Sequence, residues 1–239
     1  MRICILTNNR KPNYIHRCIK DIRKDYQGTI HLMISGKDDS YLKKYTTGFK
    51  KHYNNEAGLV NNWNKACQGY ANCLRLGKKE GVLIIEDDTG FKKGWYKQLL
   101  SYLTFVKDKR YIISLGKAMD GSVIDPHTKV PTLQLFLYRV NLQKKDKEMI
   151  SYIITWLDSH AVYFPPTIDL EDMAQMVEKF GVKNNSMHDI LIGYYLFRKL
   201  YPIWIASPPQ AINIGATNTS VGWIDNRNDD FLDWDYEKP

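Results

Sequence analysis

The 239-residue sequence lacks any apolar run close to the roughly 20 residues that a helix needs to cross a bilayer. Its opening letters, MRICILTNNR, contain only a short apolar run, so we expect a first strand there and no secretory leader. The four cysteines include no C-x-x-C pair, and each falls within a predicted strand or helix. We therefore expect free thiols and a reducing, cytoplasmic location.

The sequence has fewer acidic than basic residues, which gives a formal net charge of +8 and an isoelectric point of about 9.1. A basic surface can bind nucleic acid or an anionic membrane. Most of the excess is lysine, in a chain that is also rich in Asn, Ile and Tyr, and an AT-rich genome would produce the same composition. Pairs such as Lys43-Lys44 and Lys50-Lys51 are typical of solvated surface. The charge leaves a polyanionic partner open without requiring one.

The sequence has no internal repeat and no flexible linker, and its first half alternates between strand and helix patterns. Short apolar runs predict the strands, and apolar residues at helical spacing predict the helices between them. The predicted strands cover 2–7, 29–36, 81–86 and 111–116, and the predicted helices cover 12–26, 57–70 and 94–106. This alternation predicts an α/β fold in three layers, α/β/α, around a mainly parallel, Rossmann-like sheet.

The second half is less regular and predicts a mixed part of the same sheet. Strands are expected at 132–140, 151–156 and 160–164, followed by helices at 170–181 and 186–201 and a short strand from 203. In the first of these helices, Met173, Met176, Val177 and Phe180 are predicted to face inward, and Gly181 to end the helix. We expect residues 1–239 to form a single domain.

Polar side chains follow three of the predicted strands, at residues 7–10, 36–39 and 86–88. In open parallel sheets, ligands bind beyond the carboxyl ends of the strands, and these ends share one edge. The three polar segments therefore predict a binding site at that edge.

The last of these segments, Glu86-Asp87-Asp88, places three adjacent carboxylates directly after a buried strand. It has three interpretations: a polar turn, a carboxylate pair for acid and base chemistry, or a divalent cation site. Neighbouring residues at a strand end point to opposite sides, which disfavours a catalytic pair. Glu86 and Asp88 share one side, and carboxylate oxygens suit Mg²⁺ or Mn²⁺. The cation site is favoured because it also relieves the repulsion among the carboxylates.

The sequence resembles nucleotide-sugar-dependent glycosyltransferases of the GT-A fold over most of its length. The letters IIEDD and GFKKGWYKQLL look like their D-x-D region, and RICILTNNRKPNYIHRCIKDI is similar to their first strand, nucleotide loop and helix. NNEAGLVNNWNKA looks like the helix beside the donor diphosphate. HDILIGYYL and SPPQAINIGATNTSVG resemble the downstream acidic helix and the closing loop, which often reads HIG..S in relatives.

The resemblance implies roles for individual residues. Asp88 would bind the metal, Mn²⁺ or Mg²⁺, while Asn213 stands where some relatives have a metal-binding His, and His188 is a substitute for that ligand or a polar residue beside it. Donor-binding roles fall to Thr7, Asn9, Arg10, Asn62, Glu86 and Asp87. Asp189 stands where many inverting members have their general base.

The implied activity is metal-dependent transfer of a sugar from a nucleotide sugar, expected to be a UDP-sugar, to a hydroxyl acceptor, with inversion. Residues 1–116 would bind the donor and residues 117–239 the acceptor. A glycan acceptor is favoured, and modified DNA is the alternative, as in virus-encoded transferases that act on hydroxymethylated pyrimidines, in which case the host cytoplasm would be the location. A nucleotidyltransferase of related topology is disfavoured, because the loop TNNRKPNY has no glycine. A binding module without catalysis is the remaining alternative.

Asp189 tests the catalytic interpretation, because Ser186-Met187-His188-Asp189 also matches a helix-capping box. If Asp189 is the base, Asp189→Asn should lower kcat by about 100-fold or more, because the amide cannot accept the proton. If it only caps the helix, the variant should lose about 0.5–2 kcal/mol of stability and keep its kcat. Steady-state rates and thermal melts of both proteins separate the two, and early melting with normal turnover would exclude the catalytic role.

Overall fold

The structure, a computed structural model, describes residues 1–54, 62–105, 110–116, 132–135, 139–145, 148–154, 160–184, 188–201, 203–207 and 209–215. Its helices are α1 (Ile15–Asp25), α2 (Asn62–Leu76), α3 (Trp95–Phe105), α4 (Leu170–Asn184) and α5 (His188–Arg198), with a 3-10 turn at Ser40–Leu42. Its strands are β1 (Arg2–Asn8), β2 (Ile30–Ser35), β3 (Phe49–Asn54), β4 (Val82–Glu86), β5 (Thr89–Phe91), β6 (Ile112–Ser114), β7 (Thr132–Leu135), β8 (Arg139–Lys145), β9 (Glu148–Ile154), β10 (Ala161–Phe164), β11 (Ile203–Ser207) and β12 (Ala211–Asn213).

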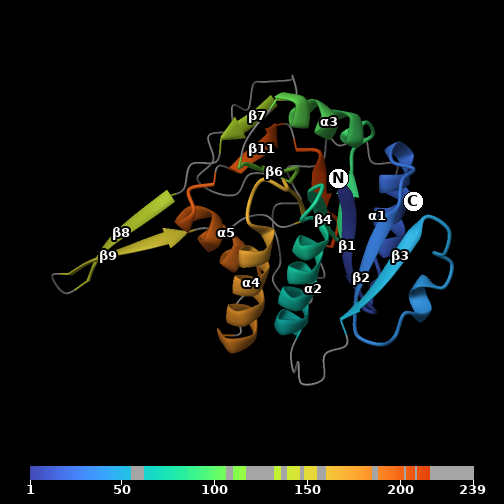
Figure 1. Cartoon of the computed structure of the whole chain (residues 1–239), viewed down its shortest axis with the longest axis horizontal. Coiled ribbons are helices and arrows are strands. Elements are labelled where there is room, and N and C mark those ends of the chain that lie inside the picture. The colour runs from blue at the N-terminus through green and yellow to red at the C-terminus, as the bar shows by residue number, and fades with distance from the viewer. Residues whose placement is uncertain are drawn as a thin grey trace.

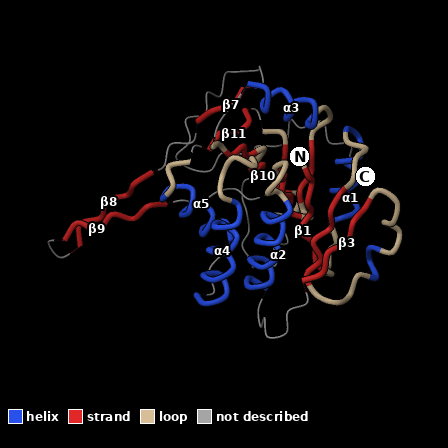
Figure 2. Tube along the Cα trace, in the orientation of Figure 1, coloured by secondary structure: helices blue, strands red, loops and turns tan. Residues whose placement is uncertain are grey.

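Eight strands form one sheet in the order β3-β2-β1-β4-β10-β6-β11-β7 (Figure 1). The β3-β2-β1-β4 half is parallel throughout, whereas β10 and β7 run antiparallel to their neighbours. Two small antiparallel pairs, β5-β12 and β8-β9, complete the strands, and the β8-β9 hairpin extends away from the rest in Figure 2. The predicted mixed, mainly parallel sheet is confirmed.

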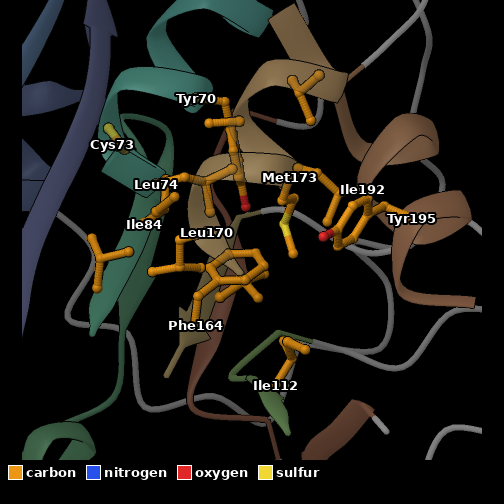
Figure 3. Close-up of a cluster of buried hydrophobic side chains, with 14 of the residues drawn as sticks. Tyr70, Cys73, Leu74, Ile84, Ile112, Phe164, Leu170, Met173, Ile192 and Tyr195 are labelled. Carbon is orange, nitrogen blue, oxygen red and sulfur yellow. The ribbon is translucent and has the colours of Figure 1, made fainter. Parts of the chain in front are cut away.

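Alternate residues of the buried strands pack into two separate apolar clusters, one on each face of the sheet. Cys4 and Ile84 face a cluster with α2, α4 and α5, in which Leu74, Met173 and Ile192 point inward (Figure 3). Their strand neighbours, such as Ile5 and Ile85, face the other cluster, formed with α1 and α3. Because strand side chains alternate between faces, one sheet with fully apolar strands requires helices on both sides. The three-layer α/β/α arrangement is confirmed.

All four cysteines are buried thiols that take part in no disulfide. Cys18 of α1 donates a weak hydrogen bond to the carbonyl of Glu86, with a sulfur–oxygen distance of 3.9 Å. Cys4 of β1 lies against Cys73 of α2, and Cys67 of α2 faces α4. Burial raises the pKa of the Cys73 thiol well above its ordinary value, which keeps the group protonated.

Several expected boundaries differ from the observed ones. Strand β3 escaped prediction because its letters, FKKHYN, carry polar residues on both faces of an edge strand. The strand expected over 132–140 is recorded as β7 and the start of β8, and residues 136–138 lie outside the described part. The start of the helix expected from residue 57 likewise lies outside it. None of the helices in the described ranges combines the length and apolar character needed to span a membrane.

The role expected of Gly181 is wrong, because α4 continues through it to Asn184. Phe180 is also 39% exposed rather than inward. A Cβ at Gly181 would lie 2.4 Å from the sulfur and 2.6 Å from the Cβ of Cys67 on α2. Real Cβ atoms do not approach other atoms this closely, so glycine sets the distance between the two helices. It is a packing residue.

We expect Gly181→Ala to destabilise the protein by about 1–3 kcal/mol, because the new methyl group must displace α2 or α4. In a Cys67→Gly background the two clashing atoms are gone, and alanine favours a helix by about 1 kcal/mol over glycine. The same substitution should then be neutral or stabilising. Urea unfolding of the four proteins in this cycle measures the reversal, and equal costs in both backgrounds would contradict the packing role.

Candidate functional site

The polar ends of β1, β2 and β4 meet at one edge of the sheet, as predicted. Parallel pairing of β1 with β4 sets Leu6 beside Glu86, so the residues that follow both strands are neighbours. The hydroxyl of Thr7 donates to Oδ2 of Asp87 at 2.7 Å. At the end of β2, the amide of Asn9 donates to Oδ2 of Asp38 at 2.5 Å. Segments far apart in the sequence thus form one polar rim.

Asp87 is buried at this rim and is held by two donors. Arg10 forms an ion pair with its Oδ1, and Thr7 occupies its Oδ2. Burial raises the pKa of Asp87 to about 6, with a further contribution from the charge of Asp88, while Arg10 and Thr7 act in the opposite direction. The same guanidinium Nη2 also lies 3.0 Å from Oδ2 of Asp88. Arg10 therefore shares one positive charge between two buried carboxylates.

Glu86, Asp88 and His160 form a group whose ligand atoms all lie within 4.8 Å of one another. The Oδ1 atom of Asp88 is buried and has no hydrogen-bond partner within the described residues. A buried carboxylate oxygen without a donor is costly unless a cation contacts it. Two carboxylates and one imidazole also suit Mn²⁺ and similar divalent ions. The donor set therefore fits a metal, and Glu86 and Asp88 do converge on one site.

His160 is the functional candidate that the sequence did not reveal. It directly precedes β10, which runs antiparallel to β4, so β10 begins where β4 ends. The carbonyl of His160 accepts hydrogen bonds from the Glu86 amide at 3.0 Å and from the Thr89 hydroxyl at 2.9 Å. No local pattern around the letters HAVYF indicates which strand they will pair with. A prior expectation that β10 lies beside β4 was the one signal that could have identified His160.

His188, the expected substitute ligand, contacts Glu86 but is not part of the Glu86–Asp88–His160 group. Its Nε2 lies 3.1 Å from Oε1 of Glu86, and its ring stacks on Tyr70 at 4.9 Å between centroids. Burial opposes protonation of His188, but the hydrogen bond and charge of Glu86 outweigh it and raise the pKa of the imidazole. This geometry allows His188 to fix the orientation of the Glu86 carboxylate. A direct metal bond from His188 stays a prediction.

Asn213 lies close to Asp88 through a short strand pair. Strand β12 pairs with β5, opposing Asn213 to Thr89, and the amide of Ile214 donates to the carbonyl of Asp88 at 2.7 Å. The side-chain oxygen of Asn213 accepts from the amide of Gly215 at 2.7 Å. A Cβ on Gly215 would lie 2.8 Å from Oδ2 of Asp88, so glycine permits this approach. The side-chain oxygen of Asn213 is therefore already engaged by a backbone amide. The metal role expected of Asn213 stays a prediction.

The two remaining candidates come from helix starts. Asp189 is the second residue of α5, is half-buried and is not part of the Glu86–Asp88–His160 group. Its charge acts on Cys67, where burial is the larger cause that raises the pKa of the thiol to about 12. Asn62 begins α2, and the structure describes only its backbone. Ser186, the expected cap partner of Asp189, lies outside the described residues.

Comparisons with known proteins support the fold and go no further. No protein-family model matches the sequence, and no curated protein matches it. Among solved structures, TarS of S. aureus superimposes with a TM-score of 0.53 at 14% identity, over 91% of this chain and 37% of TarS. TarS 1-349, alone and in complex with UDP-GlcNAc, gives TM-scores of 0.50 at 15% and 14% identity. Those two matches cover 89% of this chain and 60% and 58% of the TarS fragment.

The chain therefore has the predicted GT-A type α/β fold and spans 37% to 60% of the TarS chains it matches. At such low identity the likeness concerns architecture alone. The roles of the individual site residues rest on the geometry described above.

Asp88→Asn tests the metal centre directly. The change keeps the side-chain size but removes the charge that would hold a divalent cation, so Mn²⁺ binding measured by calorimetry should be lost. The melting temperature should change little, because Arg10 keeps Asp87 as its partner. Glu80→Gln is the matched control, since Glu80 precedes the opposite end of β4 and pairs with Arg2. Undiminished Mn²⁺ binding in Asp88→Asn would remove the metal from this site.

Proposed function

We propose that the chain is a metal-dependent glycosyltransferase that uses a nucleotide sugar, with a UDP-sugar as the expected donor. One observation carries the proposal: Glu86, Asp88 and His160 converge at the sheet edge beside the Arg10–Asp87 pair. The similar TarS fragment has been solved in complex with UDP-GlcNAc, which supports a nucleotide sugar as the ligand class. Arg10 and the Glu86–Asp88–His160 group together suit a ligand that carries both a sugar and a diphosphate.

The proposed reaction is a direct displacement at the anomeric carbon. The acceptor oxygen forms a bond to this carbon as the bond to the diphosphate oxygen breaks, and the acceptor proton passes to Asp189. A divalent cation held by Glu86, Asp88 and His160 would supply positive charge for the leaving diphosphate. Thr7 and Arg10 hold Asp87 in place at the rim, where it would orient the ribose. His188 would keep Glu86 in its ligating orientation.

A donor screen is the experiment that tests this function. The protein is mixed with Mn²⁺ and a panel of UDP-, GDP- and dTDP-sugars, and both melting temperature and nucleoside diphosphate release are measured. A UDP-sugar should raise the melting temperature with Mn²⁺ and not with a chelator, because ligands stabilise the state that binds them. Asp88→Asn should lose the shift.

Two outcomes would overturn the proposal. Failure of every nucleotide sugar to bind or react would exclude glycosyl transfer. Release of pyrophosphate from a nucleoside triphosphate and a sugar 1-phosphate would instead identify a nucleotidyltransferase.

The acceptor prediction follows from the basic charge. A glycan or other small hydroxyl acceptor is expected, and modified duplex DNA is the rival, because a net charge of +8 suits phosphate contacts. The affinity for DNA would fall as the salt concentration rises, with log K decreasing by about 0.9 per phosphate contact for each unit of log salt. The target base would also have to flip out of the duplex to be modified. Transfer is measured to hydroxymethylated duplex DNA and to glycans at low and high salt. Efficient, salt-sensitive labelling of the DNA would reverse the preference.

A further inference from the structure

Arg10 supplies positive charge to Asp88, which is expected to bind the metal, and to its neighbour Asp87. One of its nitrogens, Nη2, contacts Oδ1 of Asp87 and lies 3.0 Å from Oδ2 of Asp88. The side chains of Arg10, Asp87 and Asp88 are 20%, 6% and 7% exposed, so water screens these contacts weakly. Asp88 is therefore shared between a fixed cation of the chain and any metal that uses its free Oδ1.

A divalent ion on Asp88 would stand within a few ångströms of the guanidinium. Like charges at such range in a poorly screened site repel strongly. Arginine keeps its proton at every ordinary pH, so Arg10 cannot relieve this repulsion by becoming neutral. The repulsion can then be relieved in two ways: the guanidinium of Arg10 moves away, or an anion binds between it and the metal.

The guanidinium has a donor that is not yet used. Its Nε is buried and has no acceptor among the described residues, while its Cζ atom lies 5.7 Å from the centre of the Tyr14 ring. Phosphate oxygens are strong acceptors for the fork of donors that arginine presents. Arg10 is thus placed to exchange a carboxylate of Asp88 for an oxygen of a bound diphosphate.

We propose that Arg10 is an internal counter-cation that competes with the metal for Asp88, so that metal and nucleoside diphosphate bind cooperatively. This inference rests on the proposed function. Without a nucleotide, Arg10 neutralises the carboxylates and keeps metal affinity low. With a diphosphate present, the phosphate oxygens draw Arg10 away and Asp88 becomes available to the metal. By reciprocity, the metal strengthens nucleotide binding by the same factor.

The test is a calorimetric titration of Mn²⁺ into the wild type and variants, with and without UDP. Arg10→Gln and Arg10→Met both remove the charge, and each should bind Mn²⁺ at least about tenfold more tightly than the wild type without UDP. Arg10→Lys keeps the charge and should stay closer to the wild type. Arg2→Gln is the matched control, because it lowers the net charge equally at the Glu80 ion pair, away from the site.

UDP should tighten Mn²⁺ binding to the wild type by a larger factor than to Arg10→Gln or Arg10→Met. Thermal melts show which of the two variants is folded, and either one suffices. If Mn²⁺ binds them no more tightly than the wild type, while Asp88→Asn abolishes binding, the counter-cation role is wrong and the metal site stands. If Mn²⁺ binds none of the proteins, with or without UDP, the metal site fails and this inference with it.

Discussion

Mutual repulsion of three adjacent carboxylates at the end of β4 is the constraint around which the site is arranged. The repulsion is reduced because each of the three carboxylates contacts different partners. Asp87 turns to Thr7 and Arg10, Glu86 turns to His188, and Asp88 lies between Arg10 and the group with His160. These partners come from β1 and the loop after it, from the residue before β10 and from the start of α5, so the site exists only when the sheet edge is assembled.

The parts of the site that the sequence predicted depend on local geometry. Alternation along a strand puts Glu86 and Asp88 on one side, and parallel pairing brings Thr7 to Asp87. His160 and Gly181 depend instead on which elements become neighbours: β10 beside β4, and α4 against α2. A single sequence carries period and turn signals but no record of pairing across long separations. The architecture was therefore predictable, whereas the place of His160 in the candidate metal group and the helix contact were not.

The comparison with TarS and the geometry of the site contribute at different levels. The TM-scores of 0.50 to 0.53 establish the architecture, and at 14–15% identity they assign no residue a role. The placement of Arg10, Asp88 and His160 carries the functional proposal, because these side chains come together from three separate segments of the chain. Folds of this kind accept many chemistries, so function has to be argued from the side chains.

The buried cysteines make the layers of the protein separately observable. Cys18 lies between α1 and the end of β4, Cys4 and Cys73 between β1 and α2, and Cys67 between α2 and α4. A thiol reagent reaches a buried sulfur only when its interface opens, so the labelling rate at each cysteine reports the free energy of one local opening. Cys18 contacts the backbone of Glu86, so its protection relative to Cys67 would distinguish loosening of the site from loosening of the helical layer.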